Sequence, residues 1–323
     1  MSLVNEHGAD VLRLWVASQD YQDDIPFSND IFARVADTYR SIRNTLRILL
    51  GNLADFDPAK DAVAPEQWTE LDRYVFARSE ELVADVLKSY ASCQFSQVYQ
   101  AVNRFCAVEL SALYVDVLKD RMYCNARNDV ARRAAQTVMH RILTSLIKLT
   151  APILPFTTEE SWQFLGQKDS IHAQNFPDLS KIETAKDSSF QTRWNSFLEL
   201  RLQVNQKLED ARRDKIIGKS LEARVSIVSK NLTDAEAKLL EELFIVSQVK
   251  IIHIDSLTAV EPSDKQAIVR MQGPGKELPI IEVDRAPGHK CIRCWKYYDH
   301  VGSNPQHPEL CDRCTQVVLD WKE

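Results

Sequence analysis

Residues 291–295 read Cys-Ile-Arg-Cys-Trp and residues 311–314 read Cys-Asp-Arg-Cys, which makes two Cys-x-x-Cys turns late in the chain. Each turn places two thiolates on one side of the backbone. Two such turns brought together offer four sulfur atoms in a tetrahedron, the geometry that Zn²⁺ prefers in a closed structural site. The pattern predicts one structural zinc ion bound by Cys291, Cys294, Cys311 and Cys314, with no open coordination position for catalysis.

Three other interpretations of these cysteines are weaker. Disulfides would suit a secreted protein, but nothing else in the sequence is typical of one. A redox Cys-x-x-Cys motif needs a single pair on a thioredoxin-like fold. His300 and His307 lie between the two turns and could replace a cysteine, although their setting is that of solvated loop residues. A tail this short buries little core, so we expect the metal to supply its folding energy.

The rest of the chain has the composition of a globular protein of two or three domains. It has 323 residues, of which 45% are hydrophobic and 27% charged, and only 8 glycines. No apolar run reaches the length of a membrane span and the first residues do not form a signal peptide, so we expect a cytoplasmic protein. Cys93, Cys106 and Cys124 are scattered, and we expect them to be buried as small apolar side chains.

Apolar periodicity predicts a mainly α-helical chain up to about residue 217. Apolar residues recur at helical spacing in residues 8–17. They do so again after Ser28 or Asn29, either of which could cap the next helix. Thr157 or Thr158 is a further candidate cap, with Glu159 and Glu160 behind it. We therefore expect a short helix at residues 8–17 and then an antiparallel helical bundle at residues 26 to about 180. The predicted helices of the bundle are residues 30–50, 71–90, 95–117, 129–149 and a short one through 162–164, and a longer helix follows at 190–217.

Beyond residue 217 the period changes from that of helices to that of strands. Short segments rich in Val and Ile alternate with one helical stretch, Leu232 to Val246, which indicates a small α/β unit. Gly273-Pro274-Gly275 fits a turn between the last two strands. The predicted strands are residues 223–228, 249–254, 267–271 and 278–283.

Two groups of cations stand out in a chain whose net charge is −6. The first is a helical face at residues 40–47, where arginines spaced three and four apart lie away from the apolar stripe. Spacing alone favours an ordinary solvated face, whereas arginine forks also suit phosphate oxygens. The second group is residues 191–224, whose eight basic and five acidic side chains give +3. A locally basic segment on a mildly acidic protein indicates a confined site for a polyanion.

No catalytic group is recognisable in the sequence. It has no P-loop, no dinucleotide-binding fingerprint and no nucleophile elbow, and its scattered His, Asp and Glu residues form no familiar constellation.

Taken in order, the segments resemble the C-terminal half of bacterial-type isoleucyl-tRNA synthetases, which are class Ia aminoacyl-tRNA synthetases. Residues 8–15 (Gly-Ala-Asp-Val-Leu-Arg-Leu-Trp) resemble the stretch soon after that family's KMSKS loop, and residues 39–47 resemble the first helix of its anticodon-binding domain. Motifs at residues 110–116, 119–123, 151–156 and 159–162 recur across class Ia. Residues 218–223 and the first cysteine turn favour the isoleucine enzymes.

The resemblance implies four regions and an incomplete enzyme. Residues 1–25 would follow the catalytic core, and residues 26–182 would form the helical anticodon-binding domain. Residues 183–285 would form a long helix with a small α/β junction domain, and residues 286–323 would form the zinc-binding knuckle. The family's HIGH and KMSKS signatures and its editing domain are not in this sequence. The chain is thus expected to lack the catalytic site of an ATP-dependent isoleucine–tRNA ligase, and to be inactive by itself.

The resemblance also implies a partner, the anticodon stem and loop of isoleucine tRNA, with ATP used only by the full-length enzyme and with no DNA or membrane involved. We expect a monomer. For Trp295, stacking on a base and sheltering the zinc ion are both open. The predicted tRNA contacts are Arg40, Arg43, Asn44, Arg47, Lys215, Lys219, Arg224 and Trp295.

Two other classes of protein remain as alternatives. One is a zinc-containing DNA-binding or repair module, since glycosylase tails carry a similar four-cysteine finger. It would need a catalytic amine or carboxylate near the start of the chain, and the helical bundle does not suit it. The other is a structural interaction domain, which would bind no RNA.

Overall fold

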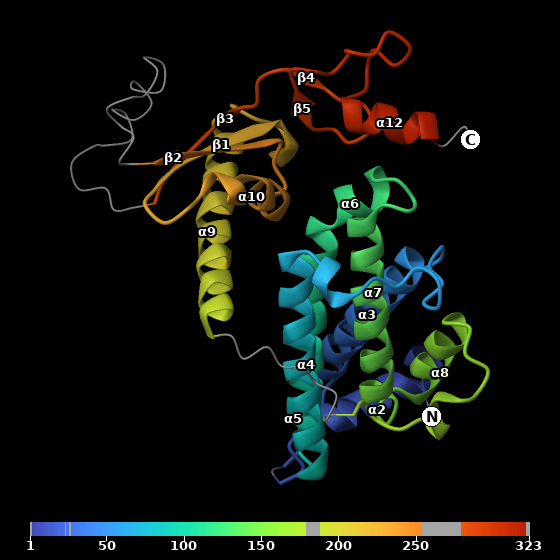
Figure 1. Ribbon diagram of the computed structural model, residues 1–323. Coiled ribbons are helices and arrows are strands. Elements are labelled where there is room, and N and C mark those ends of the chain that lie inside the picture. The colour runs from blue at the N-terminus through green and yellow to red at the C-terminus, as the bar shows by residue number, and fades with distance from the viewer. Residues whose placement is uncertain (1, 23, 26, 179–187, 254–278, 321–323) are drawn as a thin grey trace. The chain divides into compact units, whose positions relative to one another are not determined.

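The computed structural model describes residues 2–22, 24–25, 27–178, 188–253 and 279–320 (Figure 1). The chain forms two compact units. Unit 1 comprises Met1–Met122 and Arg127–Lys186, and unit 2 comprises Tyr123–Ala126 and Asp187–Glu323. Within the described stretches, no helix has both the length and the apolar character needed to span a membrane.

Unit 1 is the helical bundle that the periodicity predicts. Helices α3, α4, α5 and α7 run beside one another in Figure 1, and α4 packs against both α5 and α7. Its α-helices are α1 (Ser2–His7), α2 (Ala9–Ser18), α3 (Asn29–Asn52), α4 (Glu70–Ala91), α5 (Phe95–Arg104), the first four residues of α6 (Lys119–Cys124), α7 (Val130–Thr150) and α8 (Pro155–Phe164). Its short 3₁₀ turns are η1 (Pro65–Gln67) and η3 (Ile171–Ala173).

The core of unit 1 forms where the apolar stripes of these helices meet. On α3 the buried positions include Val35, Ile42, Leu46 and Leu49, which recur at helical spacing. Leu49 is fully buried. The mainly α fold is confirmed, and burial of these stripes supplies most of the stability because helices in proteins are stabilised mainly by packing of an amphipathic face rather than by propensity.

Two helix starts illustrate which caps the sequence can reveal. The prediction that Ser28 caps α3 is confirmed, because its hydroxyl accepts a hydrogen bond from the Ile31 amide at 3.2 Å. The prediction that Thr157 or Thr158 caps α8 is wrong, because α8 begins at Pro155. The carboxylate of Asp10 on α2 instead accepts the Phe156 and Thr157 amides, at 3.4 and 2.8 Å.

The helix expected at residues 95–117 changes type part-way. Its first part is α5, and Phe105–Val115 then form a π-helix, η2. A π-helix is rare and widens each turn by one residue. Phe105, Leu110 and Tyr114 of η2 remain buried against the bundle core, so the wider turn keeps these large side chains inside.

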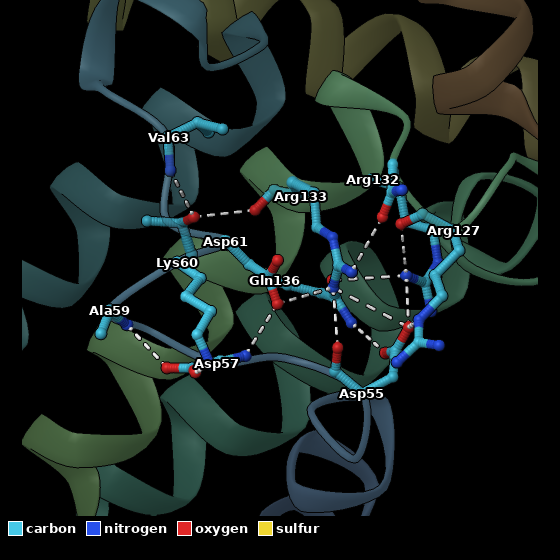
Figure 2. Close-up of polar contacts among 12 residues, drawn as sticks. Asp55, Asp57, Ala59, Lys60, Asp61, Val63, Arg127, Arg132, Arg133 and Gln136 are labelled. Carbon is cyan, nitrogen blue, oxygen red and sulfur yellow. Dashed lines mark hydrogen bonds and ion pairs between the residues drawn. The ribbon is translucent and has the colours of Figure 1, made fainter.

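A network of hydrogen bonds and ion pairs connects the loop after α3 to helix α7 (Figure 2). Arg132 donates two hydrogen bonds to the Asp55 carboxylate, at 2.9 and 3.0 Å, and Gln136 donates a third at 2.7 Å. Arg133 donates to the main-chain oxygen of Asp55 at 2.9 Å. Gln136 and Arg133 are buried, so each needs these partners to offset the loss of water.

Unit 2 contains the α/β part predicted from the change of period. Helix α9 (Ser188–Arg213) leads through the 3₁₀ turn η5 (Ser220–Glu222) into strand β1 (Ala223–Ser229). The turn η6 (Asp234–Glu236) and helix α10 (Ala237–Phe244) then cross over to β2 (Gln248–His253), which is parallel to β1. Strand β3 (Ile280–Arg285) pairs antiparallel with the other edge of β1. The predicted strand at 267–271 and the turn at 273–275 lie outside the described residues.

The end of unit 2 is a small zinc-finger-like element. Strands β4 (His289–Lys290) and β5 (Tyr297–Tyr298) form an antiparallel hairpin, and helix α12 (Asp312–Asp320) follows. Gly288 has φ +88°, and a Cβ there would lie 2.4 Å from the main-chain carbon of Tyr298, so the close approach requires glycine. The Tyr297 amide donates to the Ser247 hydroxyl at 2.8 Å, which joins this hairpin to the α/β part.

The prediction that all three scattered cysteines are buried is only partly right. Cys106 and Cys124 are buried, but Cys93 is exposed. Cys93 has a left-handed backbone with φ +56° just after α4 ends. The left-handed turn directs the Cys93 side chain away from the buried face of α4, so the side chain is exposed although cysteine is apolar.

Candidate metal centre and nucleic-acid interface

The four cysteines of the two Cys-x-x-Cys turns come together as predicted. Their sulfur atoms all lie within 4.8 Å of one another, and all four side chains are buried. The Cys294 and Cys311 sulfurs are 3.9 Å apart. Four sulfurs bound to one Zn²⁺ at about 2.3 Å would be spaced about 3.8 Å apart, so this donor set fits a tetrahedral zinc ion.

Local structure explains how the sulfurs converge. The Trp295 amide donates to the Cys291 carbonyl at 2.9 Å and closes the first turn, while the Thr315 amide donates to Cys311 at 2.9 Å at the start of α12. The thiols of Cys294, Cys311 and Cys314 also hydrogen-bond to one another. Hydrogen bonds with Cys294, Cys311 and Arg293 lower the pKa of Cys314, while those with Cys294 and Cys314 raise the pKa of Cys311. A bound dication would allow all four to be thiolates.

Trp295 follows the first cysteine turn and is 54% exposed. It is also one of the few non-glycine residues with a left-handed backbone, at φ +64°. The amines of Lys219 and Lys290 lie 5.5 and 5.8 Å from the centre of its ring. The structure therefore brings together two predicted contacts, Lys219 and Trp295, as a cation-flanked aromatic surface.

An open groove lies close to this aromatic surface. Its volume is about 470 Å³, and one of its lining residues, Lys290, also lies beside the Trp295 ring. Ile292, in the first cysteine turn, also lines the groove and is 55% exposed. The groove is lined by His289, Lys290, Ile292, Val301, Pro308 and Glu309.

The predicted residues on α3 do not behave as one set. Arg40 pairs with Asp37 one turn earlier, and Arg43 bonds Glu160 of α8 at 2.7 Å and Tyr39 at 3.2 Å. Asn44 and Arg47 are exposed. Among the described residues, Arg47 makes no hydrogen bond or ion pair, so it is the α3 arginine most available to a phosphate.

The remaining two predicted contacts differ in their availability. Lys215 is exposed and left-handed, with φ +60°, just after α9. Arg224 lies on β1 opposite Asp284 of β3, and their charged groups are 3.6 Å apart. Arg224 thus forms a cross-strand ion pair with Asp284.

Two residues of this region were not predicted from the sequence. Lys290 completes the pair of cations at Trp295, and it sits in a two-residue strand that no periodicity marks. Arg293 donates to the Cys314 sulfur at 3.6 Å. Its position between two cysteines in the turn was a signal, because arginine there can reach a sulfur of the partner turn.

The comparisons with known proteins agree with this arrangement. Residues 72–227 match the family described as the anticodon-binding domain of tRNA ligase, and residues 288–317 match the zinc finger found in FPG and IleRS. Residues 72–227 are thus similar to a tRNA-ligase anticodon-binding domain, and residues 288–317 to a zinc finger.

The curated relatives make the relationship more specific. The chain is 44% identical over 99% of its length to the isoleucine–tRNA ligase of Methylacidiphilum infernorum, and 43% identical over 98% to that of Syntrophotalea carbinolica. It is 40% identical over 98% to that of Desulfotalea psychrophila. The chain is therefore a relative of the isoleucine–tRNA ligases, and it spans 33 to 34% of the length of these three proteins, in their C-terminal third.

Proposed function

We propose that this chain binds the anticodon stem and loop of isoleucine tRNA as part of an ATP-dependent isoleucine–tRNA ligase. The observation that carries the proposal is the match of residues 72–227 to the anticodon-binding domains of tRNA ligases. The ligation of isoleucine we assign to the part of the relatives that this chain does not span. The chain by itself would then hold the tRNA without charging it.

Each unit has its own proposed tRNA-binding region. In the helical domain (26–182), Asn44 and Arg47 would contact the phosphate backbone, with Arg40 and Arg43 secondary because Asp37 and Glu160 already neutralise them. In unit 2, Trp295 would stack on an unpaired base, while Lys219 and Lys290 would neutralise nearby phosphates. Lys215 would extend this cationic edge, and Arg224 would contribute least because Asp284 pairs with it.

The zinc ion we propose is single and structural. Cys291, Cys294, Cys311 and Cys314 would hold it, and its thiolate ligands leave no position for substrate. The ion would supply folding energy to residues 286–323, a segment too short to bury a core of its own. Residues 183–285 would then form the junction between this finger and the helical domain. We propose a monomer in the cytoplasm, where thiols stay reduced.

Direct binding of the purified chain to isoleucine tRNA tests the function. We expect binding that weakens steeply as salt rises, because phosphate contacts release counterions. A tRNA with the same body and a different anticodon is the control, and equal affinity for the two would refute anticodon recognition.

Replacement of the exposed tryptophan tests the stacking role. Trp295→Ala should weaken tRNA binding by about 1–3 kcal/mol, the usual value of one base–aromatic stack, and Trp295→Phe should weaken it less. Zinc content measured by atomic absorption should stay at one ion per chain in both variants. Unchanged affinity together with lost zinc would instead assign Trp295 to sheltering the metal.

A further inference from the structure

A four-residue segment far away in the sequence is built into the zinc finger. Tyr123–Ala126 belong to unit 2 although the residues on either side of them belong to unit 1. Cys124 is 7% exposed, and its side chain lies in one apolar cluster with the four clustered cysteines and Leu310. The finger therefore buries a side chain that its own 38 residues, 286–323, do not supply.

Arg293 is the residue that connects this segment to the metal site. One nitrogen of its guanidinium, Nη1, donates both to the main-chain oxygen of Cys124 and to the Cys314 sulfur, the latter at 3.6 Å. Its other terminal nitrogen donates to the Tyr123 oxygen at 3.4 Å. The Cys124 thiol in turn donates to the Arg293 carbonyl at 3.7 Å.

A second arginine holds the same segment from the second cysteine turn. Arg313 donates to the Asn125 side-chain oxygen at 3.2 Å. Each Cys-x-x-Cys turn thus contributes its internal arginine, Arg293 or Arg313, to Tyr123–Ala126. Because guanidinium donors are fixed in one plane, the position of each arginine depends on how the cysteines of its turn are oriented.

We propose that Tyr123–Ala126 are an integral part of the zinc finger, and that zinc binding and the packing of this segment are coupled through Arg293. A zinc-bound sulfur is a negatively charged acceptor fixed in space, so it orients the guanidinium that also holds the Tyr123 and Cys124 carbonyls. The coupling rests on the zinc ion of the proposed function, but it does not depend on RNA binding.

Coupling between the zinc site and the Tyr123–Ala126 segment is reciprocal, so each can be perturbed while the response of the other is measured. Removing zinc should release the segment and make the Cys124 thiol reactive. Loosening the segment should in turn accelerate loss of the zinc ion. Groups that orient metal ligands commonly change metal affinity by about 10–100-fold when removed, so we expect changes of about 10-fold.

The experiment uses the full 323-residue chain carrying Cys93→Ser, which removes the exposed thiol. Iodoacetamide labelling of Cys124, followed by peptide mass spectrometry, measures release of the segment, and a chromogenic chelator measures the rate of zinc loss. The variants are Arg293→Ala and Asn125→Ala, and the matched control is Arg285→Ala at an exposed arginine of β3. Asn125→Ala leaves every residue of 286–323 in place, so it remains informative if Arg293→Ala does not fold.

We expect both variants to label at Cys124 and to lose zinc about 10-fold faster than the parent and the control. Chelation of the parent should raise Cys124 labelling to a similar degree. A zinc-loaded chain whose Cys124 labels equally in every variant, and equally after chelation, would overturn the coupling alone. A chain that retains no zinc after reconstitution would overturn the zinc assignment and the coupling with it.

Discussion

Arg40, Arg43 and Arg47 lie within two turns of helix α3, yet they differ in what else they bind. Arg43 bonds Glu160 and Tyr39, and Arg40 pairs with Asp37. Arg47 has no such partner among the described residues. Sequence spacing could place all three on the surface, but it could not reveal these partners, because Glu160 lies 117 residues away from Arg43.

Arg47→Ala therefore separates RNA binding from stability. The free energy of unfolding should change by less than about 0.5 kcal/mol, since no partner is lost on an exposed position. Affinity for tRNA should fall severalfold for all anticodons alike, and the slope of log affinity against log salt should become shallower by about 1. Filter binding at several salt concentrations, beside denaturant unfolding, measures both. A change in anticodon preference would point to base contact instead.

Asp55 gives unit 1 a predictable response to acid. Burial acts to raise its pKa, but hydrogen bonds from Arg132 and Gln136 and the charges of Arg132 and Arg133 outweigh burial, so the pKa lies below its usual value. A carboxylate with a lowered pKa in the folded state stabilises the fold above its unfolded pKa, near 3.9, and this stabilisation is lost as pH falls through the folded value.

Asp55→Asn should accordingly destabilise unit 1 by roughly 2 kcal/mol at pH 7, because Arg132 loses a charged acceptor. The difference between variant and parent should shrink as pH falls below about 4. Urea unfolding from pH 7 down to pH 3 measures this, and Asp85→Asn, at an exposed position of α4, is the control. A difference that stays constant across this range would show that Asp55 acts through shape rather than charge.

At the scale of elements, the bundle helices and the strands β1, β2 and β3 follow from apolar periodicity, which records burial directly. Structural features that depend on contacts between residues far apart in the sequence do not follow from this periodicity. The cap of α8 comes from Asp10, about 146 residues earlier, so no local pattern at Thr157 could show it. The clustering of the four cysteines was predictable because their spacing is itself the signal, whereas the approach of Lys290 to the Trp295 ring depends on the fold.

Asp10→Ala should then weaken one particular helix junction. The buried carboxylate accepts the Phe156 and Thr157 amides and the Thr157 hydroxyl, and all three donors would lose their partner. We expect a loss of about 1–2 kcal/mol in the stability of unit 1, with hydrogen exchange accelerated in α8 and hardly changed in α9. Asp10→Asn should recover part of the stability. Uniform acceleration in both helices would mean that the effect is global.

At the scale of the whole molecule, the finger should unfold separately from unit 1 when zinc is withdrawn. In the proposed function the metal would supply folding energy only to the finger, while unit 1 has a mainly apolar core and no cluster of three or more candidate metal ligands among its described residues. Chelation, or Cys291→Ser, should abolish ordered structure at residues 286–320 and leave the main helical melting transition in place. Circular dichroism with and without chelator tests this, and loss of the main transition would contradict it.

The π-helix η2 has a consequence for comparing this chain with its relatives. Each of its turns holds about one residue more than an α-helical turn, so Phe105–Val115 accommodate extra residues within the helix. Residues from Asp116 onward are rotated about the axis relative to an uninterrupted continuation of α5. An alignment with a relative whose helix continues without a π-helix would therefore need a gap between residues 105 and 115 to keep inward-facing residues matched to inward-facing ones.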